Sequence, residues 1–188
     1  MRLFTNNAKN GVLCIGGIAV AWLVFFKLNF VFFSHFEKSH YINWVFIPAG
    51  VRLVSVLLFD EYAIVGLFIG ALITSLGMTV SPTEAVVLSL ISAFNPYLAI
   101  KLTKRILKLH TMLNGLSAKQ LVVMSFFAAI FNCLTHNLYF YFINPEQYEW
   151  FSCVSMFTGD FAGILIVLYL FALVLKIIRK SVAANVTN

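Results

Sequence analysis

The sequence predicts an all-α membrane protein, a bundle of six transmembrane helices with both termini in the cytoplasm. Hydrophobic side chains make up 61% of the 188 residues, charged ones only 11%, and the mean hydropathy is +0.93. Soluble domains have about a quarter of their residues charged. Helices are predicted because unpaired backbone is costly in lipid and because the apolar stretches lack the alternating pattern of barrel strands.

Six apolar stretches are the second observation. They cover approximately residues 11–33, 41–59, 62–80, 84–100, 120–143 and 150–175. Most approach the roughly 20 residues that cross about 30 Å of hydrocarbon. The longest polar stretch, the basic loop 101–119, is too short to bury a core of its own. We therefore expect one integral membrane domain over residues 1–188.

Helix-start signals precede the last three stretches. Ser81-Pro82-Thr83-Glu84 offers a capping serine, a proline at the first helical position and a glutamate two residues later. Residues 117–120 and 144–147 repeat this pattern. We expect helices to begin at these three places.

The third observation is the distribution of charge, which predicts the orientation. Six spans with the N-terminus inside place ten of the thirteen basic residues in the cytoplasm: Arg2, Lys9, Lys101, Lys104, Arg105, Lys108, Lys119, Lys176, Arg179 and Lys180. This is the positive-inside pattern, and it explains the net charge of +6 without a nucleic-acid partner. Segment 101–110 either lies on the anionic inner leaflet or forms a solvated loop.

The second apolar stretch holds an arginine beside helix-breaking residues. Pro48 and Gly50 predict a kink in a helix over 41–59. Arg52 follows about eleven residues inside this helix, near the bilayer midplane, where a lone charge costs several kcal/mol. Asp160, about ten residues into the last helix, is expected at the same depth.

We predict a buried ion pair between Arg52 and Asp160, because either charge alone in lipid would cost far more than the pair. Two roles remain open for it. The pair either locks the packing of the second and sixth helices, or one or both charges bind an anionic group or a proton.

Further polar residues gather in the outer half of the predicted bundle. The candidates for lining a cavity are Lys27, Asn43, Asn132, His136 and Thr158. Asn132 and His136 are four residues apart and share one helix face. In one interpretation these side chains line a cavity open to the outside, with Arg52 and Asp160 at its floor. In the other, each bonds a neighbouring helix, and Lys27 extends toward the interface.

Small residues predict close helix packing. Gly66 and Gly70 in the third stretch, and Gly159 and Gly163 in the sixth, are spaced one helical turn apart, which allows helices to approach closely. Pro96 should kink the fourth helix near its inner end.

No enzyme motif is present: the sequence has no HExxH, no GxSxG and no phosphate-binding loop. Cys14, Cys133 and Cys153 form no CxxC pair, and we interpret them as apolar packing residues. The protein is therefore predicted to be no enzyme and to need no cofactor or metal.

Three stretches resemble a known family of bacterial sensor domains. Phe46-Ile47-Pro48-Ala49-Gly50-Val51 is similar to the aromatic-x-Pro-small-Gly-aliphatic motif of the MASE1 integral membrane domain. Residues 66–72 resemble the glycine-rich helix that follows it, and 159–165 resemble the Gly-Asp-x-x-Gly-x-Leu of its last helix. The resemblance implies a bacterial inner-membrane sensory module, with Pro48, Gly50 and Asp160 as framework positions.

The chain departs from that family in size, since such domains usually have about eight spans and are fused to a cytoplasmic output domain. We expect a non-enzymatic sensory or partner-binding module that meets a ligand or a membrane partner and relays to a signalling protein. A solute-binding subunit of a transporter is the first alternative, because six spans in about 190 residues also resemble the S components of energy-coupling factor systems. An assembly subunit of a membrane complex is the second.

Overall fold

The computed structural model describes residues 8–39, 42–78, 81–108, 116–143, 145 and 149–186. Its elements, in chain order, are α1 (Ala8–Phe33), the 3-10 turn η1 (Ser34–Phe36), β1 (Glu37–Ser39), β2 (Ile42–Asn43), α2 (Pro48–Phe59), α3 (Glu61–Leu76), α4 (Pro82–Ile106), α5 (Ala118–Ile143) and α6 (Trp150–Val186). The predicted helical class is confirmed. The one addition is a short antiparallel hairpin of β1 and β2.

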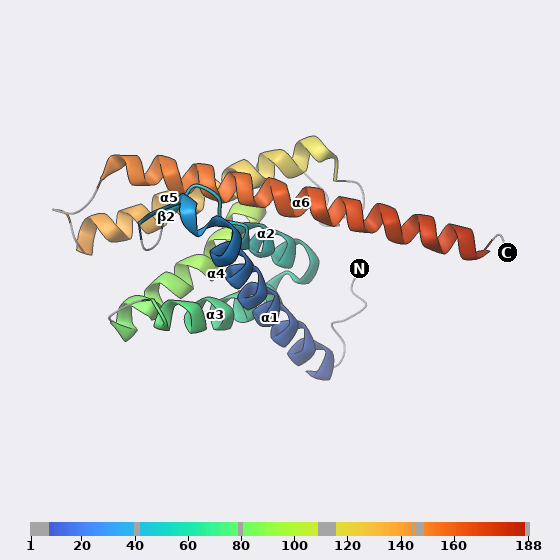
Figure 1. Ribbon diagram of the computed structural model, residues 1–188, viewed down its shortest axis with the longest axis horizontal. Coiled ribbons are helices and arrows are strands. Elements are labelled where there is room, and N and C mark those ends of the chain that lie inside the picture. The colour runs from blue at the N-terminus through green and yellow to red at the C-terminus, as the bar shows by residue number, and fades with distance from the viewer. Residues whose placement is uncertain are drawn as a thin grey trace.

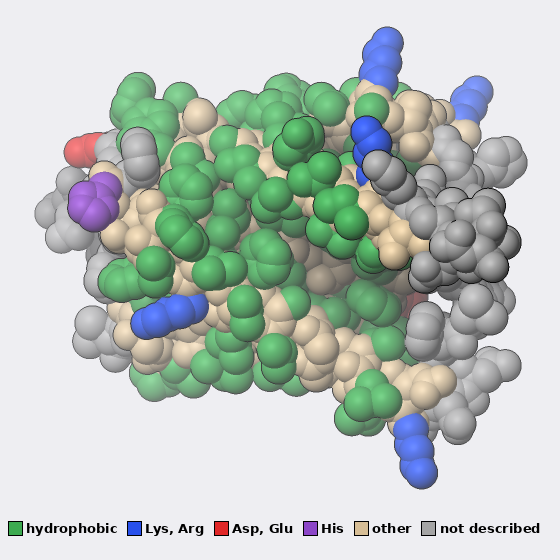
Figure 2. Space-filling view, turned by 45° about the vertical axis from the view of Figure 1, so that its right-hand side comes forward, with side chains coloured by type: hydrophobic (Ala, Val, Ile, Leu, Met, Phe, Trp, Pro, Cys, Tyr) green, Lys and Arg blue, Asp and Glu red, His purple; other side chains and the backbone are tan. Residues whose placement is uncertain are grey.

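Four of the six helices are long and apolar enough to cross a membrane: α1, α4, α5 and α6. α2 and α3 are apolar but shorter, at 12 and 16 residues. Hydrophobic side chains cover most of the face seen in Figure 2, and many large ones are exposed, as Phe142 and Leu13 are at 73% each. An apolar exterior around these long helices indicates a membrane protein.

The helices alternate in direction (Figure 1). α1, α3 and α5 run away from the end of the molecule that carries both termini, and α2, α4 and α6 return to it. α2 lies in the middle, packed against α1, α3, α4 and α6. Nine of its twelve residues are buried, Arg52 among them.

The second apolar stretch is not one kinked helix, so the prediction of a helix over 41–59 is wrong in its first part. α2 begins at Pro48, and Ile47 before it forms a turn. Residues 42–46 include β2 and hold no helical turn, and we call them the extended segment. Proline suits the first helical position because the missing N–H has no partner there in any helix. This backbone before α2 is tolerated because the Ile47 N–H donates to Asn29 Oδ1 at 2.8 Å and the Phe46 N–H to the Gly159 carbonyl at 3.0 Å.

Two helices continue past the apolar stretches that predicted them. α4 continues through Pro96 to Ile106, so the first residues of the expected basic loop are helical, and α6 continues to Val186 instead of ending near 175. Lysine, arginine and leucine are good helix formers, and the charges at both helix ends did not stop either helix. Residues 109–115 of the loop lie outside the described residues.

Two of the three helix starts are confirmed. α4 begins at Pro82, and α5 begins at Ala118. At the start of α5 the Ser117 N–H donates to Gln120 Oε1 at 2.8 Å, and the Gln120 N–H donates to Ser117 Oγ at 3.3 Å, which is a complete capping box. The third signal, 144–147, lies outside the described residues apart from Pro145.

The predicted glycine faces do allow close approach, but the two faces meet different partners. Added Cβ atoms at Gly66 and Gly70 would lie 2.7 Å and 2.8 Å from side-chain atoms of Ile18 and Trp22 on α1. At Gly159 and Gly163 a Cβ would collide with backbone carbonyls of the extended segment before α2, not with another helix.

Candidate functional site

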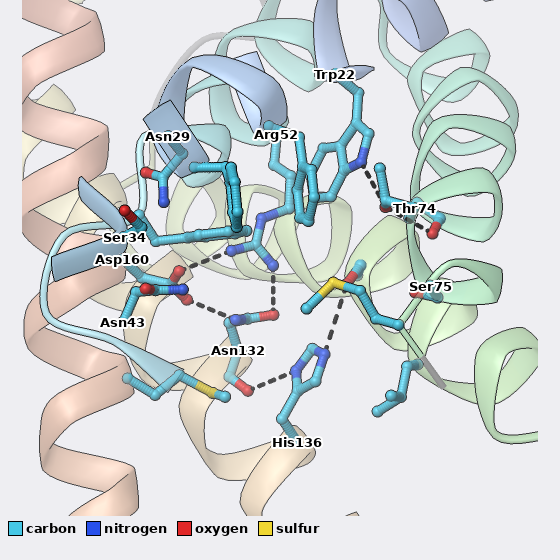
Figure 3. Close-up of a pocket in the computed structure, with 18 residues that line it drawn as sticks. Trp22, Asn29, Ser34, Asn43, Arg52, Thr74, Ser75, Asn132, His136 and Asp160 are labelled. Carbon is cyan, nitrogen blue, oxygen red and sulfur yellow. Dashed lines mark hydrogen bonds and ion pairs between the residues drawn. The ribbon is translucent and has the colours of Figure 1, made fainter. Parts of the chain in front are cut away.

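The centre of the bundle holds a closed ring of three polar side chains from three helices (Figure 3). Arg52 Nη2 on α2 lies 2.8 Å from Asp160 Oδ1 on α6, and Arg52 Nη1 donates to Asn132 Oδ1 on α5 at 2.7 Å. Asn132 Nδ2 closes the ring by donating to Asp160 Oδ2. The predicted ion pair is therefore present, and Asn132 bridges it. We call these three residues the Arg52 ring.

The Arg52 ring is almost fully removed from the surface. The side chains of Arg52 and Asp160 are 5% and 3% exposed. Two aromatic rings lie against the guanidinium, with the Arg52 Cζ 5.8 Å from the Trp22 ring and 5.5 Å from the Phe46 ring. Such contacts stabilise a desolvated cation. The charges are thus matched by each other, by an amide and by π faces.

A cavity of about 110 Å³ adjoins the Arg52 ring, and all three residues of the ring line it. One water molecule needs about 10–15 Å³ by this kind of measure, so the space suits a small molecule. All six helices contribute to its lining, and Ser34, Asn43 and Met78 place its mouth at the end opposite the chain termini. The lining residues from the helices are Trp22, Phe26, Asn29, Phe30, Phe46 just before α2, Arg52, Ala71, Thr74, Ser75, Leu88, Ser92, Asn132, His136, Met156 and Asp160.

α1 presents one polar-aromatic face to this cavity. Trp22, Phe26 and Asn29 are spaced i, i+4 and i+7, so they share one side of the helix. Trp22 Nε1 donates to Thr74 Oγ1 on α3 at 3.1 Å, and Asn29 holds the backbone of Ile47. α1 therefore forms one wall and also fixes the start of α2.

α5 presents the opposite, polar wall. His136 Nδ1 lies 3.0 Å from the Asn132 carbonyl oxygen, which can only accept, so Nδ1 carries a hydrogen. In a neutral imidazole Nε2 is then the acceptor, and it has Ser92 Oγ on α4 at 3.5 Å, the outer limit of a hydrogen bond. Asn95 Nδ2 on α4 donates to Thr135 Oγ1 on α5, a second contact between these two helices.

Five predicted residues meet at this place: Asn43, Asn132 and His136 line the cavity with Arg52 and Asp160. Whether they bind a ligand stays a prediction.

Two predicted lining residues do not belong to the cavity. Lys27 lies on the exposed side of α1, with its Nζ 5.6 Å from the Phe30 ring, because it is one residue away from the face that carries Phe26. Thr158 is exposed as well, and its hydroxyl donates back to the Val154 carbonyl within α6.

Several contributors carry no strong signal in the sequence. Trp22, Thr74 and Ser92 look like ordinary residues of apolar helices, and Asn95 draws attention only as the neighbour of Pro96. The spacing of Trp22, Phe26 and Asn29 is the one pattern that could have identified the face of α1.

Comparisons of the chain with protein-family models, with curated proteins and with solved structures found no match.

Proposed function

We propose that this protein is a non-enzymatic sensory module of a bacterial inner membrane, which binds a small molecule in the central cavity and relays its presence along α6. One observation carries the proposal. Met156 and Asp160 line the cavity on α6, and the same helix continues to Val186, beyond the rest of the bundle (Figure 1). A helix that touches the ligand at one end and projects at the other can transmit a small shift.

In this proposal the chain crosses the membrane six times, with both termini in the cytoplasm. The alternating directions of the six helices support it, since α2 with the extended segment before it and α3 can each complete a pass. This orientation places the C-terminal ends of α4 and α6 in the cytoplasm. It follows the positive-inside rule, because both ends carry basic residues. The cavity then opens to the periplasm.

The resemblance to MASE1 domains is consistent with the arrangement of the three stretches that carry it. Residues 46–51 include the backbone that packs on Gly159 and Gly163 of the stretch 159–165. Gly70 of the stretch 66–72 supports Trp22 in the cavity wall. The three stretches therefore surround one site, which supports a shared function for them.

A second candidate is a solute-binding subunit of a transporter, similar to the S components of energy-coupling factor systems. The cavity favours it, because all six helices supply lining residues and the floor is closed by the Arg52 ring. This arrangement suits retention of a solute. In that case α6 would dock on a coupling subunit and not on a signalling enzyme.

Native mass spectrometry of the protein extracted gently from its own membranes tests the proposal, because it weighs bound metabolites and bound proteins together. We expect a small molecule together with a signalling protein. A small molecule with transporter subunits would support the second candidate, and a protein partner without any small molecule would support an assembly subunit.

A pair of variants on α3 locates the bound molecule. Ser75→Phe fills the cavity, whereas Ile73→Phe places the same ring on the exposed side of the helix, where Ile73 is 53% exposed. The proposal expects the small molecule to be lost from Ser75→Phe and kept by Ile73→Phe. Retention by both variants would contradict binding in this cavity.

A further inference from the structure

The floor of the cavity has no spare charge to offer a ligand. Within the Arg52 ring, the guanidinium binds the carboxylate, and the Asn132 amide occupies the second carboxylate oxygen and the second Nη atom. Arg52 and Asp160 cancel each other's charge, so an anion at Arg52 would add a second negative charge next to Asp160, and a cation at Asp160 would add a second positive charge next to Arg52. A buried charge without a partner of its own is strongly unfavourable, so the floor disfavours both charged classes.

Aromatic surface dominates the part of the cavity toward α1. Trp22, Phe26, Phe30 and Phe46 all line it. Phe46 meets Trp22 and Phe26 edge-on, with ring centroids 6.3 Å and 6.4 Å apart, so this cluster is held in place by its own contacts. Aromatic walls of this kind favour a flat ligand, because ring pairs add attraction beyond the apolar area that they bury.

The opposite wall offers one acceptor that is weakly used. His136 is 7% exposed, and its Nε2 has only the 3.5 Å contact with Ser92 among the described residues. With Nδ1 committed to the Asn132 carbonyl, the ring is fixed in orientation and Nε2 faces the cavity (Figure 3). A ligand N–H or O–H could give this nitrogen a full hydrogen bond.

From the neutral floor, the aromatic wall and the His136 wall we infer that the ligand is an uncharged, planar aromatic or heteroaromatic molecule whose N–H or O–H group donates to His136 Nε2. The inference rests on the proposed function, since both use the same cavity. It adds the charge class, the shape and the recognition contact.

A series of four small probes of matched shape tests the charge and the donor separately. Benzamide is neutral with an N–H donor, methyl benzoate is neutral without one, benzoate is an anion, and benzamidine is a cation. The full chain is placed in lipid nanodiscs, and binding is followed by the fluorescence of Trp22. The variant Trp44→Phe/Trp150→Phe keeps Trp22 as the only one of the three tryptophans.

A second variant measures how much each probe simply dissolves in the bilayer. Trp22→Phe/Trp44→Phe keeps only Trp150, which is 80% exposed and lies outside the cavity lining. Its response is subtracted from that of the Trp22 protein.

We expect benzamide to bind at least about tenfold more tightly than benzoate and benzamidine. We also expect it to bind about fivefold to tenfold more tightly than methyl benzoate, the factor that one net hydrogen bond provides. His136→Phe keeps an aromatic ring but removes the acceptor, and it should bring benzamide down to the affinity of methyl benzoate. The comparison of probes on the otherwise unchanged cavity stands even if His136→Phe does not fold.

Failure of this inference can be separated from failure of the proposed function. Benzoate or benzamidine binding more tightly than benzamide would overturn the uncharged class, while a metabolite found by native mass spectrometry would still support a binding module. Equal affinity of benzamide and methyl benzoate would overturn the role of His136. If no probe binds the Trp22 protein, the aromatic class is wrong, and only the absence of a native metabolite would remove the binding function as well.

Discussion

Arg52 and Asp160 are 108 residues apart in the chain, and their side chains lie 2.8 Å apart in the middle of the bundle. The contact ties α2, the most central helix, to α6, the helix that projects furthest. Because both side chains are at most 5% exposed, the pair has little water to replace a lost partner. We therefore expect the contact to stabilise the bundle, to keep the cavity floor neutral and to hold α6 in position.

Asn132 should matter for stability nearly as much as the two charges, because it bonds both of them. Asn132→Leu keeps the branched shape and the number of side-chain heavy atoms but removes two hydrogen bonds to charged groups. We expect a loss of about 3 kcal/mol in the free energy of unfolding, since bonds to charged groups contribute about 1.5–3 kcal/mol each. Thermal unfolding in detergent measures this.

Asn137 on the same helix gives a matched control. It is 3% exposed, but its Oδ1 has no hydrogen-bond partner in the described part of the chain, and its Nδ2 donates to the Cys133 carbonyl of its own helix and, weakly, to Met156 Sδ at 3.6 Å. Asn137→Leu should cost less than about 1 kcal/mol. Equal losses for the two variants would show that Asn132 does not bridge the pair.

Gly163 should be intolerant of any side chain. A Cβ at this position would collide with the backbone carbonyl of Phe46, which cannot move without breaking the start of α2. Gly163→Ala should lower stability by more than about 2 kcal/mol through overpacking.

Gly17→Ala is the matched control for this substitution, because nothing lies within 4 Å of a Cβ added at that position of α1. There alanine should be neutral or stabilising by up to about 1 kcal/mol, as in an ordinary helix interior. A Gly163→Ala protein as stable as Gly17→Ala would contradict the close contact of α6 with the extended segment.

The orientation can be measured in cells with single cysteines in a variant that lacks Cys14, Cys133 and Cys153. His35, which is exposed beside the cavity mouth, should after substitution by cysteine react with a membrane-impermeant maleimide in intact cells. Arg105, exposed near the C-terminal end of α4, should react as cysteine only after permeabilisation if that end lies in the cytoplasm. The reverse pattern would place the cavity mouth in the cytoplasm.

Cys133 on α5 and Cys153 on α6 have Sγ atoms 3.3 Å apart, so mild oxidation with copper phenanthroline should join them. Counting free thiols after denaturation measures this, because the three thiols should fall to one, that of Cys14. Three thiols remaining reactive would indicate that α5 and α6 are not packed at this point.

Much of the fold could be predicted from composition and spacing. Apolar stretches give the helices because lipid forces the backbone to bond within itself, and Ser117 and Gln120 mark a helix start by bonding each other. The Arg52–Asp160 pair was predictable for a related reason: two opposite charges in an apolar chain have no other partner that compensates them as well.

The remaining features depend on contacts between distant segments. Pro48 starts a helix instead of kinking one because Asn29 and Gly159 bond the backbone before it, and neither residue is near it in sequence. Likewise, Lys27 and Thr158 have the right depth for a cavity but the wrong side of their helices, a rotation that only packing fixes. The depth of a residue in the membrane follows from counting residues along the helix. The side of the helix that faces the cavity depends on how the neighbouring helices pack.

A double-mutant cycle on Arg52 and Asp160 tests the central claim, that the two charges act as one neutral unit beneath the cavity. Arg52→Met and Asp160→Leu are made singly and together, and the free energy of unfolding of each protein is measured in the same detergent. Each single variant leaves a buried charge unpaired and should lose about 3–5 kcal/mol, whereas the double variant should lose much less than their sum. A coupling energy of about 2 kcal/mol or more is the predicted result; losses that add to within about 0.5 kcal/mol would show two independent charges and contradict the account.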